Sequence, residues 1–216
     1  VIPEGMENRF EHLPLECSHL YLAIEGKLAA VICVEDPLRE EAADAVRELK
    51  EAGITKVVMM TGDSERTAAA IAKRVGVDEY YSEVLPEDKA SFVEKEKELG
   101  HKVIMIGDGI NDSLALSSAN VGIAISDGAA IAREIADVTI SADNLHEIVT
   151  LKRLSTALMK RIHNNYRTII GINGGLIALG VTGIIMPTTS ALLHNMSTLT
   201  ISLRSMRNLL PKEEEA

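Results

Sequence analysis

One short stretch of the sequence, Met105-Ile-Gly-Asp-Gly-Ile-Asn-Asp112, concentrates residue types that could bind a metal ion and a phosphate. An apolar strand, expected at 102–106, runs directly into Gly107, and Asp108 and Asp112 follow. Glycine at a strand end lets the backbone turn sharply and approach a ligand closely. Carboxylate oxygens suit Mg²⁺, which usually binds together with substrate phosphates. We therefore expect both aspartates at the carboxyl end of a parallel strand, where open α/β sheets bind ligands.

Two other segments carry groups that suit a phosphate. Thr61, Gly62 and Asp63 follow an apolar strand and precede a helix, so a hydroxyl and backbone amides meet at a helix N-terminus. Lys89 follows Pro86-Glu87-Asp88 at the start of a second helix, where its ammonium group could neutralise a transferring phosphoryl group. Each feature alone has a simpler explanation, since Asp63 could cap a helix and a surface lysine is usually solvated. The order of the three segments on one expected sheet favours phosphoryl chemistry.

The elements that must position these residues alternate between strand and helix. A hairpin is expected at 20–34, and short apolar strands then alternate with helices as far as residue 140. Continuous apolar strands separated by helices predict a parallel sheet covered on both faces, and hence a doubly wound α/β domain. The net charge of −10 argues against nucleic acid as a partner.

The C-terminal part of the chain is different, because residues 168–203 contain no Asp, Glu, Lys or Arg. A single helix over these 36 residues would measure about 54 Å, well beyond the roughly 30 Å of a bilayer core. Pro187 lies near the middle and predicts a turn. We therefore expect a transmembrane helical hairpin with spans at 168–186 and 190–208, both ends cytoplasmic because basic residues flank them. A buried hairpin in a soluble core is the alternative.

The second expected span carries a possible cation site. His194, Ser197 and Thr198 share one face of a helix. A histidine inside a membrane span is costly unless it faces a site, and imidazole with hydroxyl groups suits a borderline divalent transition-metal cation. The alternative is a solvated histidine near the membrane surface. These residues do not identify the metal.

The motifs together resemble a known family. Thr61-Gly62-Asp63, Pro86-Glu87-Asp88-Lys89 and the motif from Gly107 to Asp112 are similar to the later motifs of the haloacid dehalogenase superfamily, and more specifically to the phosphorylation domain of P-type ATPases. Asp36-Pro37-Leu38-Arg39 resembles the hinge of that family. A basic segment followed by two spans resembles the end of its heavy-metal-transporting branch. The resemblance covers essentially the whole chain.

The resemblance implies a role for each motif. Asp108, with Asp112, would be a Mg²⁺ ligand, and ATP would be the nucleotide. Thr61 and Gly62, in one motif with Asp63, would bind the phosphoryl oxygens, and Lys89 would stabilise the charge that develops during phosphoryl transfer. Asn111 and Asp112 would orient the phosphoryl group and Lys89. Asp36 and Arg39 would lie at the hinge, close to the nucleotide.

The resemblance also implies an order of domains. These are the last strands of a nucleotide-binding domain with the hinge (1–32), the C-terminal part of a phosphorylation domain (33–150), a basic juxtamembrane segment (151–167), two membrane helices (168–186 and 190–208) and a cytoplasmic tail (209–216). The implied partners are ATP, a divalent transition-metal cation, membrane lipid and the missing N-terminal part of the same pump. The implied location is a prokaryotic plasma membrane, crossed several times, with the soluble domain in the cytoplasm.

One residue that the family requires has no counterpart in this sequence. The family's nucleophile is an aspartate in an Asp-Lys-Thr-Gly-Thr segment, and the sequence contains no such segment. We therefore expect the C-terminal portion of an ATP-driven heavy-metal transporter that does not turn over alone. The alternatives are a catalytically inactive membrane regulator derived from such a pump and a soluble phosphatase of the same superfamily.

Overall fold

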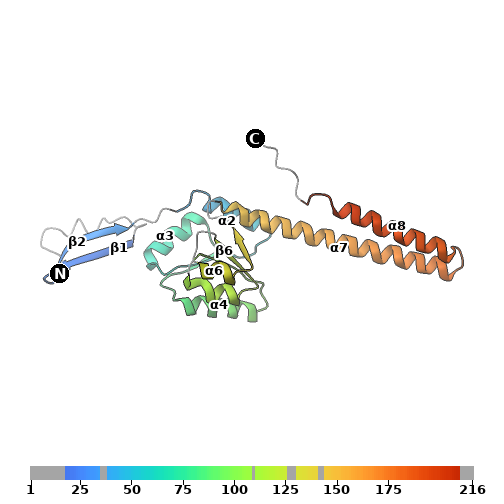
Figure 1. Ribbon diagram of the computed structural model, residues 1–216. Coiled ribbons are helices and arrows are strands. Elements are labelled where there is room, and N and C mark those ends of the chain that lie inside the picture. Colours follow the sequence, from blue (N-terminus) through green and yellow to red (C-terminus); the bar gives the residue numbers. More distant parts are fainter. Residues whose placement is uncertain (1–17, 35–37, 109, 126–129, 141–143, 210–216) are drawn as a thin grey trace. The chain divides into compact units, whose positions relative to one another are not determined.

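A computed structural model describes residues 18–34, 38–108, 110–125, 130–140 and 144–209. The chain divides into two units, residues 1–149 and 150–216. The elements of the first unit alternate as expected (Figure 1). They are β1 (Ser18–Ile24), β2 (Lys27–Val34), α2 (Ala42–Glu51), β3 (Val58–Met60), α3 (Glu65–Val75), β4 (Glu79–Tyr81), α4 (Pro86–Glu98), β5 (Ile104–Gly107), a 3-10 turn η1 (Ile110–Asp112), α5 (Ser113–Ser118), β6 (Val121–Ile125), α6 (Ala130–Ile135) and β7 (Val138–Ile140).

The expected hairpin is present at the beginning of the described chain. β1 and β2 pair in antiparallel register from Ser18 opposite Val34 to Ile24 opposite Lys27. The turn consists of Glu25 and Gly26, both with positive φ (51° and 77°). Two positive-φ residues make the type of tight turn whose twist matches that of the flanking strands.

The boundaries of α3 follow from local chemistry. Ser64 is extended and its side chain accepts a hydrogen bond from the Thr67 N–H, so Ser64 rather than Asp63 caps the helix. At the other end, Gly76 adopts the left-handed conformation (φ 79°) and its N–H donates to the Ala72 carbonyl oxygen. Glycine is favoured at this position because it has no Cβ to clash.

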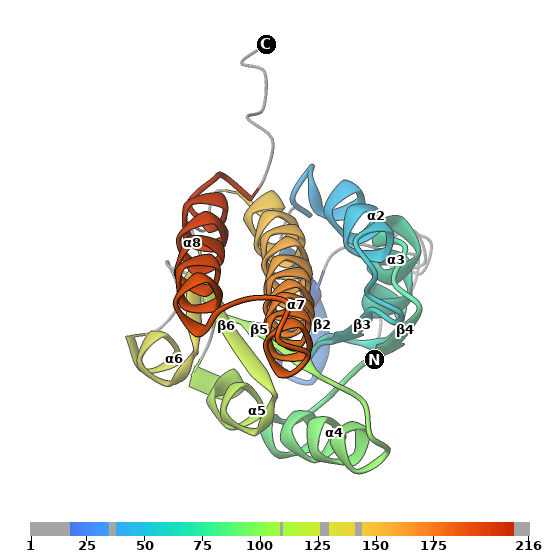
Figure 2. The same ribbon diagram turned by 90° about the vertical axis from the view of Figure 1, so that its right-hand side faces the viewer.

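The strands of this unit are parallel, as expected, but the described residues form two sheets rather than one. β3 pairs with β4, and β5, β6 and β7 pair in that order. A common core nevertheless joins the two sheets. Met60, at the end of β3, packs against a buried cluster made by α4, α5, β5 and β6, whose members are Val93, Met105, Ala115, Leu116 and Ala124. In Figure 2, α4 and α5 lie next to each other beside β5 and β6.

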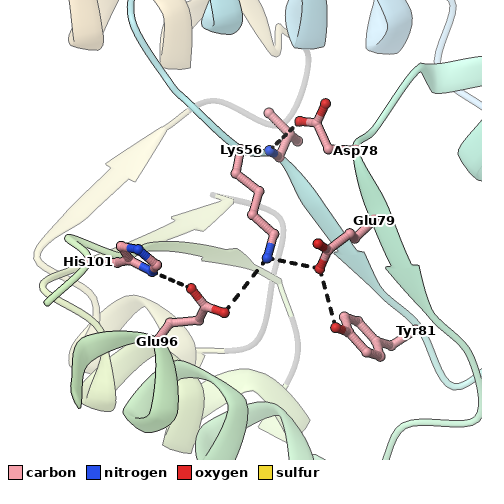
Figure 3. A network of polar contacts seen from close by, with 7 residues as sticks. Lys56, Asp78, Glu79, Tyr81, Glu96 and His101 are labelled. Atoms are coloured by element: carbon pink, nitrogen blue, oxygen red, sulfur yellow. Dashed lines mark hydrogen bonds and ion pairs between the residues drawn. The ribbon is translucent and has the colours of Figure 1, made fainter. Parts of the chain in front are cut away.

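A polar network also joins the β3–β4 pair to α4 (Figure 3). The Lys56 Nζ, just before β3, lies 2.9 Å from Glu79 Oε2 in β4 and 3.7 Å from Glu96 Oε1 in α4. His101 Nδ1 lies 2.6 Å from the other oxygen of Glu96. The Glu79 side chain raises the pKa of Lys56, mainly through its hydrogen bond. The network therefore connects the β3–β4 pair to α4.

The second unit is a pair of helices. α7 (His146–Val181) begins in the first unit, where Ile148 and Val149 are buried, and α8 (Pro187–Ser205) runs back beside it (Figure 1). Arg161 of α7 donates to the carbonyl oxygens of Ser205 (2.9 Å), Arg207 and Asn208 (2.9 Å), which follow or end α8. A guanidinium group at these positions satisfies carbonyls that a helix end leaves unpaired.

The helix ends differ from the sequence prediction. The expected basic segment 151–167 and the first expected span form one continuous helix, which ends at Val181 rather than at residue 186. Gly183 ends it in the left-handed conformation (φ 72°), and the Ile184 N–H donates to the Leu179 carbonyl oxygen. Pro187 is the first residue of α8 rather than part of the turn, because its fixed φ suits that position and its missing N–H costs nothing there.

The expected transmembrane hairpin is not seen. Among the residues that the structure describes, no helix is both long enough and apolar enough to cross a bilayer. Within the charge-free run, α7 ends at Val181, and α8 begins after a five-residue connection, 182–186.

Candidate functional site

The candidate site is at the carboxyl end of β5. Gly107 is the last residue of this strand, and the chain returns through η1 so that Asp112 packs directly on it. A Cβ at position 107 would lie 2.6 Å from the Asp112 Cβ and 2.8 Å from its Oδ2. Atoms do not approach this closely, so glycine is required at 107 to let the Asp112 carboxylate lie against the strand end.

Asp112 and Lys89 form a shielded ion pair at this position. The Lys89 Nζ lies 2.8 Å from Asp112 Oδ1, and the two side chains are 14% and 11% exposed. Lys89 is in the first turns of α4, which packs against η1 and α5. The packing of these elements shields both side chains from solvent, and the 2.8 Å contact holds the ammonium group in place. Lys89 is therefore not the solvated surface lysine of the simpler alternative.

Asp108 and Asn111 lie beside this pair and are exposed. The donor set fits Mg²⁺, because this ion keeps several waters and uses one or two carboxylates together with phosphate oxygens. Asp108 and Asp112 supply two such carboxylates at one strand end. Among the described residues, no group of three or more His, Cys, Asp or Glu side chains is placed to hold a metal ion. Mg²⁺ bound here would take its remaining ligands from phosphate or water, as this ion usually does.

The Thr61-Gly62-Asp63 loop follows β3. The Thr61 hydroxyl donates to Asp63 Oδ2 (2.7 Å) and accepts from the Asp63 N–H (3.1 Å). These bonds close a tight turn in which Gly62 is exposed. The loop precedes the N-terminus of α3, where backbone amides and the helix dipole favour an anion.

Of the two residues expected at the hinge, the structure describes only Arg39. Asp36 lies outside the described residues, whereas Arg39 is exposed and its carbonyl oxygen accepts from the Ala42 N–H at the start of α2. Neither observation tests the expected hinge role.

The residues predicted to form a cation site are in α8, but their polar groups do not converge. The Ser197 and Thr198 hydroxyls donate to the His194 carbonyl oxygen (2.7 and 3.1 Å). The imidazole instead pairs across the hairpin, with Nδ1 2.9 Å from Asn173 Oδ1 of α7. Serine and threonine hydroxyls in helices commonly donate to a carbonyl oxygen of the preceding turn. The sequence showed only that the three residues share a helix face, and it could not show where their polar groups bond.

Sequence reasoning missed one part of the site, the segment 82–85 between β4 and α4. The Glu83 N–H donates to the Asp63 carbonyl oxygen (2.9 Å), and the Val84 N–H donates to that of Thr61 (3.0 Å). Nothing in the sequence indicated these bonds, because Glu83 adopts a positive φ (52°) that glutamate rarely takes.

Comparison with known proteins identifies the family of the chain. The family model of haloacid dehalogenase-like hydrolases matches residues 4–120, which is more than half of the chain. The chain belongs to this family. The parallel α/β architecture of its first unit is the fold of a haloacid dehalogenase-like domain.

This haloacid dehalogenase-like chain is also homologous to heavy-metal P-type ATPases. It is 37% identical over 189 residues to a zinc-exporting P-type ATPase of Mycobacterium marinum, covering 87% of this chain and 26% of that protein. It is 44% identical over 176 residues to copper-transporting ATPase 2 of Rhizobium meliloti, covering 82% and 21%. A manganese-exporting P-type ATPase of Mycobacterium bovis is 38% identical over 189 residues, covering 87% and 26%. The chain thus spans about a quarter of the length of these relatives.

A solved structure extends the similarity to both units. The crystal structure of a zinc-transporting PIB-type ATPase in the E2.Pi state has a TM-score of 0.83 and 30% identity, covering 97% of this chain and 34% of that one. The homology accordingly includes α7 and α8.

Proposed function

We propose that the chain is the C-terminal portion of an ATP-driven heavy-metal transporter of the P-type ATPase class. It supplies the magnesium- and phosphate-binding part of the phosphorylation site. The observation that carries the proposal is the shielded Lys89–Asp112 pair, which lies against Gly107 beside the exposed Asp108. The similarity to pumps for zinc, copper and manganese supports the transport class.

Each residue of the site has a task in phosphoryl transfer. Asp108 and Asp112 hold Mg²⁺, which shields the charge of the phosphoryl oxygens when bound. The Lys89 ammonium group, held by Asp112, stabilises negative charge on the transferring group. The Thr61 hydroxyl and the Gly62 N–H donate hydrogen bonds to the phosphoryl oxygens. To do so, the Thr61 hydroxyl gives up its hydrogen bond to the Asp63 carboxylate. Asn111 orients the group from the side of η1.

The acceptor of the phosphoryl group comes from outside this sequence. An aspartate in an upstream Asp-Lys-Thr-Gly-Thr segment, absent here, is the nucleophile in this proposal. The chain alone therefore binds phosphate and magnesium without turnover, and ATP is hydrolysed only when the upstream part is present.

The helical pair is the membrane part of the proposed pump. Although no described helix is long and apolar enough alone, the charge-free run continues through the connection 182–186 and into α8. The structural similarity to a zinc-transporting pump over 97% of the chain also supports this assignment. The His194–Asn173 pair is a cross-helix polar contact within this run, and we assign it to the cation path. The relatives are named for three different metals and do not select one, so the choice of a divalent transition-metal cation rests on the imidazole and hydroxyl groups of α8.

The test is Asp108→Asn in the complete pump that contains this chain. Replacing the carboxylate removes a metal ligand, so Mg²⁺-dependent ATP hydrolysis is expected to fall by on the order of a hundredfold or more. Asp44→Asn is the matched control, because this exposed aspartate of α2 pairs only with Arg47 one turn away. ATPase assays at several Mg²⁺ concentrations measure both variants. Near-normal turnover of Asp108→Asn would contradict the proposal.

A further inference from the structure

Residues 82–85 form the connection between β4 and α4, and they hold the Thr61-Gly62-Asp63 loop through the backbone. Two consecutive amides, those of Glu83 and Val84, donate to the carbonyl oxygens at the two ends of the loop, 2.9 Å from Asp63 and 3.0 Å from Thr61. The loop also donates a bond in return: the Thr61 N–H donates to the carbonyl oxygen of Tyr81, the last residue of β4, at 3.0 Å. The loop is therefore held at both its ends by the chain on either side of Ser82.

The conformation of Glu83 makes this double contact possible. Its φ of 52° reverses the backbone, and among the described residues only Glu25 shares a positive φ without being glycine. An L-residue in this region carries a steric cost, which persists only where the surroundings require it. The side chain of Glu83 is exposed, so the contact is made by the main chain.

The same connection sets the start of α4. The Leu85 N–H donates to Asp88 Oδ2 (3.2 Å), and the Asp88 N–H donates back to the Leu85 carbonyl oxygen (3.1 Å). Pro86 then occupies the first helical position, where its φ is already suitable. Lys89 follows one turn into the helix and reaches Asp112. Two bonds from Glu83 and Val84 to the Thr61 loop, and two bonds between Leu85 and Asp88, thus link this loop to the start of the helix that carries Lys89.

We propose that Glu83 is a positioning residue for phosphoryl transfer. Its left-handed backbone fixes the Thr61–Asp63 loop relative to Lys89, so that the hydroxyl, the loop amide and the ammonium group act on the same phosphoryl group. This inference rests on the function proposed above, and it assigns to one exposed glutamate a role that depends on φ rather than on its carboxylate.

A substitution series separates backbone from side chain. Glu83→Gly and Glu83→Asn keep the left-handed conformation accessible, whereas Glu83→Val disfavours it and Glu83→Pro excludes it and removes the N–H. In the complete pump, we measure phosphorylation by inorganic phosphate as a function of its concentration. Gly and Asn variants are expected within about twofold of the unchanged protein, and the Val variant to need roughly fivefold more phosphate or worse.

The turn between β1 and β2 provides the matched control. Glu25 has nearly the same φ (51°) and is also exposed, but it lies in a hairpin with no bond to the Thr61 loop. Glu25→Gly and Glu25→Val should therefore leave the phosphate dependence unchanged. An equal effect of Val at both positions, or no effect of Val at position 83, would overturn the assignment.

Two further measurements keep the outcomes distinct. Hydrogen exchange on the 216-residue chain should show protected amides at Glu83 and Val84, with that protection lost in Glu83→Val while the core remains protected. Fast exchange of both amides in the unchanged chain would refute the proposed contacts. If Asp108→Asn also phosphorylates normally, then the proposed function fails, whatever the result at position 83.

Discussion

At the scale of single residues, the site depends on how Asp112 is held rather than on its charge alone. One carboxylate oxygen accepts a hydrogen bond from the Lys89 ammonium group, and the other faces the backbone of Gly107. The side chain is thereby held on both of its carboxylate oxygens. Asp108, four positions earlier, stays exposed and accessible to a ligand. In the proposed function, Asp112 therefore holds the lysine and also offers a carboxylate to the metal, whereas Asp108 binds the metal from the solvent side.

A third aspartate, Asp78, makes a testable contribution to stability. Asp78 accepts a 2.7 Å hydrogen bond from Lys50 and another of 2.7 Å from the Val57 N–H, and these bonds lower the pKa of its carboxyl group. A lowered pKa in the folded state means that the stabilisation is complete above the ordinary value and is lost as the pH falls through the folded value. Asp78→Asn should therefore lower the urea midpoint of the chain at neutral pH, with a smaller difference near pH 3.

Urea titrations from pH 7 to pH 3 measure this effect. Asp44→Asn serves as the control, since a surface pair such as Asp44–Arg47 contributes little. A pH-independent difference for Asp78→Asn would show that the hydrogen-bonded carboxylate is not the cause.

At the scale of elements, the sequence predicts what depends on local pattern. Apolar runs located β3, β5 and β6, and Gly76 located the end of α3, because strand burial and left-handed caps leave a clear signal. Strand pairing was less accessible, since the division into β3–β4 and β5–β6–β7 depends on contacts distant in sequence. Pro187 was misplaced because proline is equally compatible with a turn and with the first turn of a helix.

The site shows the same division. The motifs that contain Lys89 and Asp112 indicated that these two residues act together, and they form an ion pair. The backbone bonds of Glu83 and Val84 to the Thr61 loop could not be predicted, because the fold and not the residue type imposes the φ of Glu83. The pairing of His194 with Asn173 likewise depends on how α7 and α8 align. Periodicity within one helix contains no information on that register.

The connection between the two last helices gives a prediction about topology. If the pair enters the membrane with basic residues on the cytoplasmic side, then residues 182–186 face outward. In a complete pump whose Cys17 and Cys33 are replaced by serine, Ile184→Cys should react with a membrane-impermeant thiol reagent in intact cells. Ser155→Cys, in the α7 segment before the charge-free run, should react only after lysis. Labelling of both only after lysis would contradict the membrane assignment.

At the scale of the whole molecule, the two separate parallel sheets offer, if the chain has the proposed function, a place for the missing nucleophile. The Thr61 loop follows strand β3 of one sheet, and Asp108 follows strand β5 of the other. Within the described chain, the two sheets share a core, but no strand of one pairs with a strand of the other. An additional parallel strand could bond to an edge of each sheet. A nucleophilic aspartate at its carboxyl end would then lie between the Thr61 loop and Asp108.

This arrangement predicts complementation by the upstream part of the pump. The chain alone should give no phosphoenzyme with ATP or inorganic phosphate, because it lacks the Asp-Lys-Thr-Gly-Thr segment. Co-expression with an upstream fragment that contains this segment should restore acid-stable phosphorylation, measured with radiolabelled phosphate. The signal should disappear with Asp108→Asn in this chain and with Asp→Asn in the upstream segment. Phosphorylation of the chain alone would instead place an acceptor within these 216 residues and would remove the need for a second part.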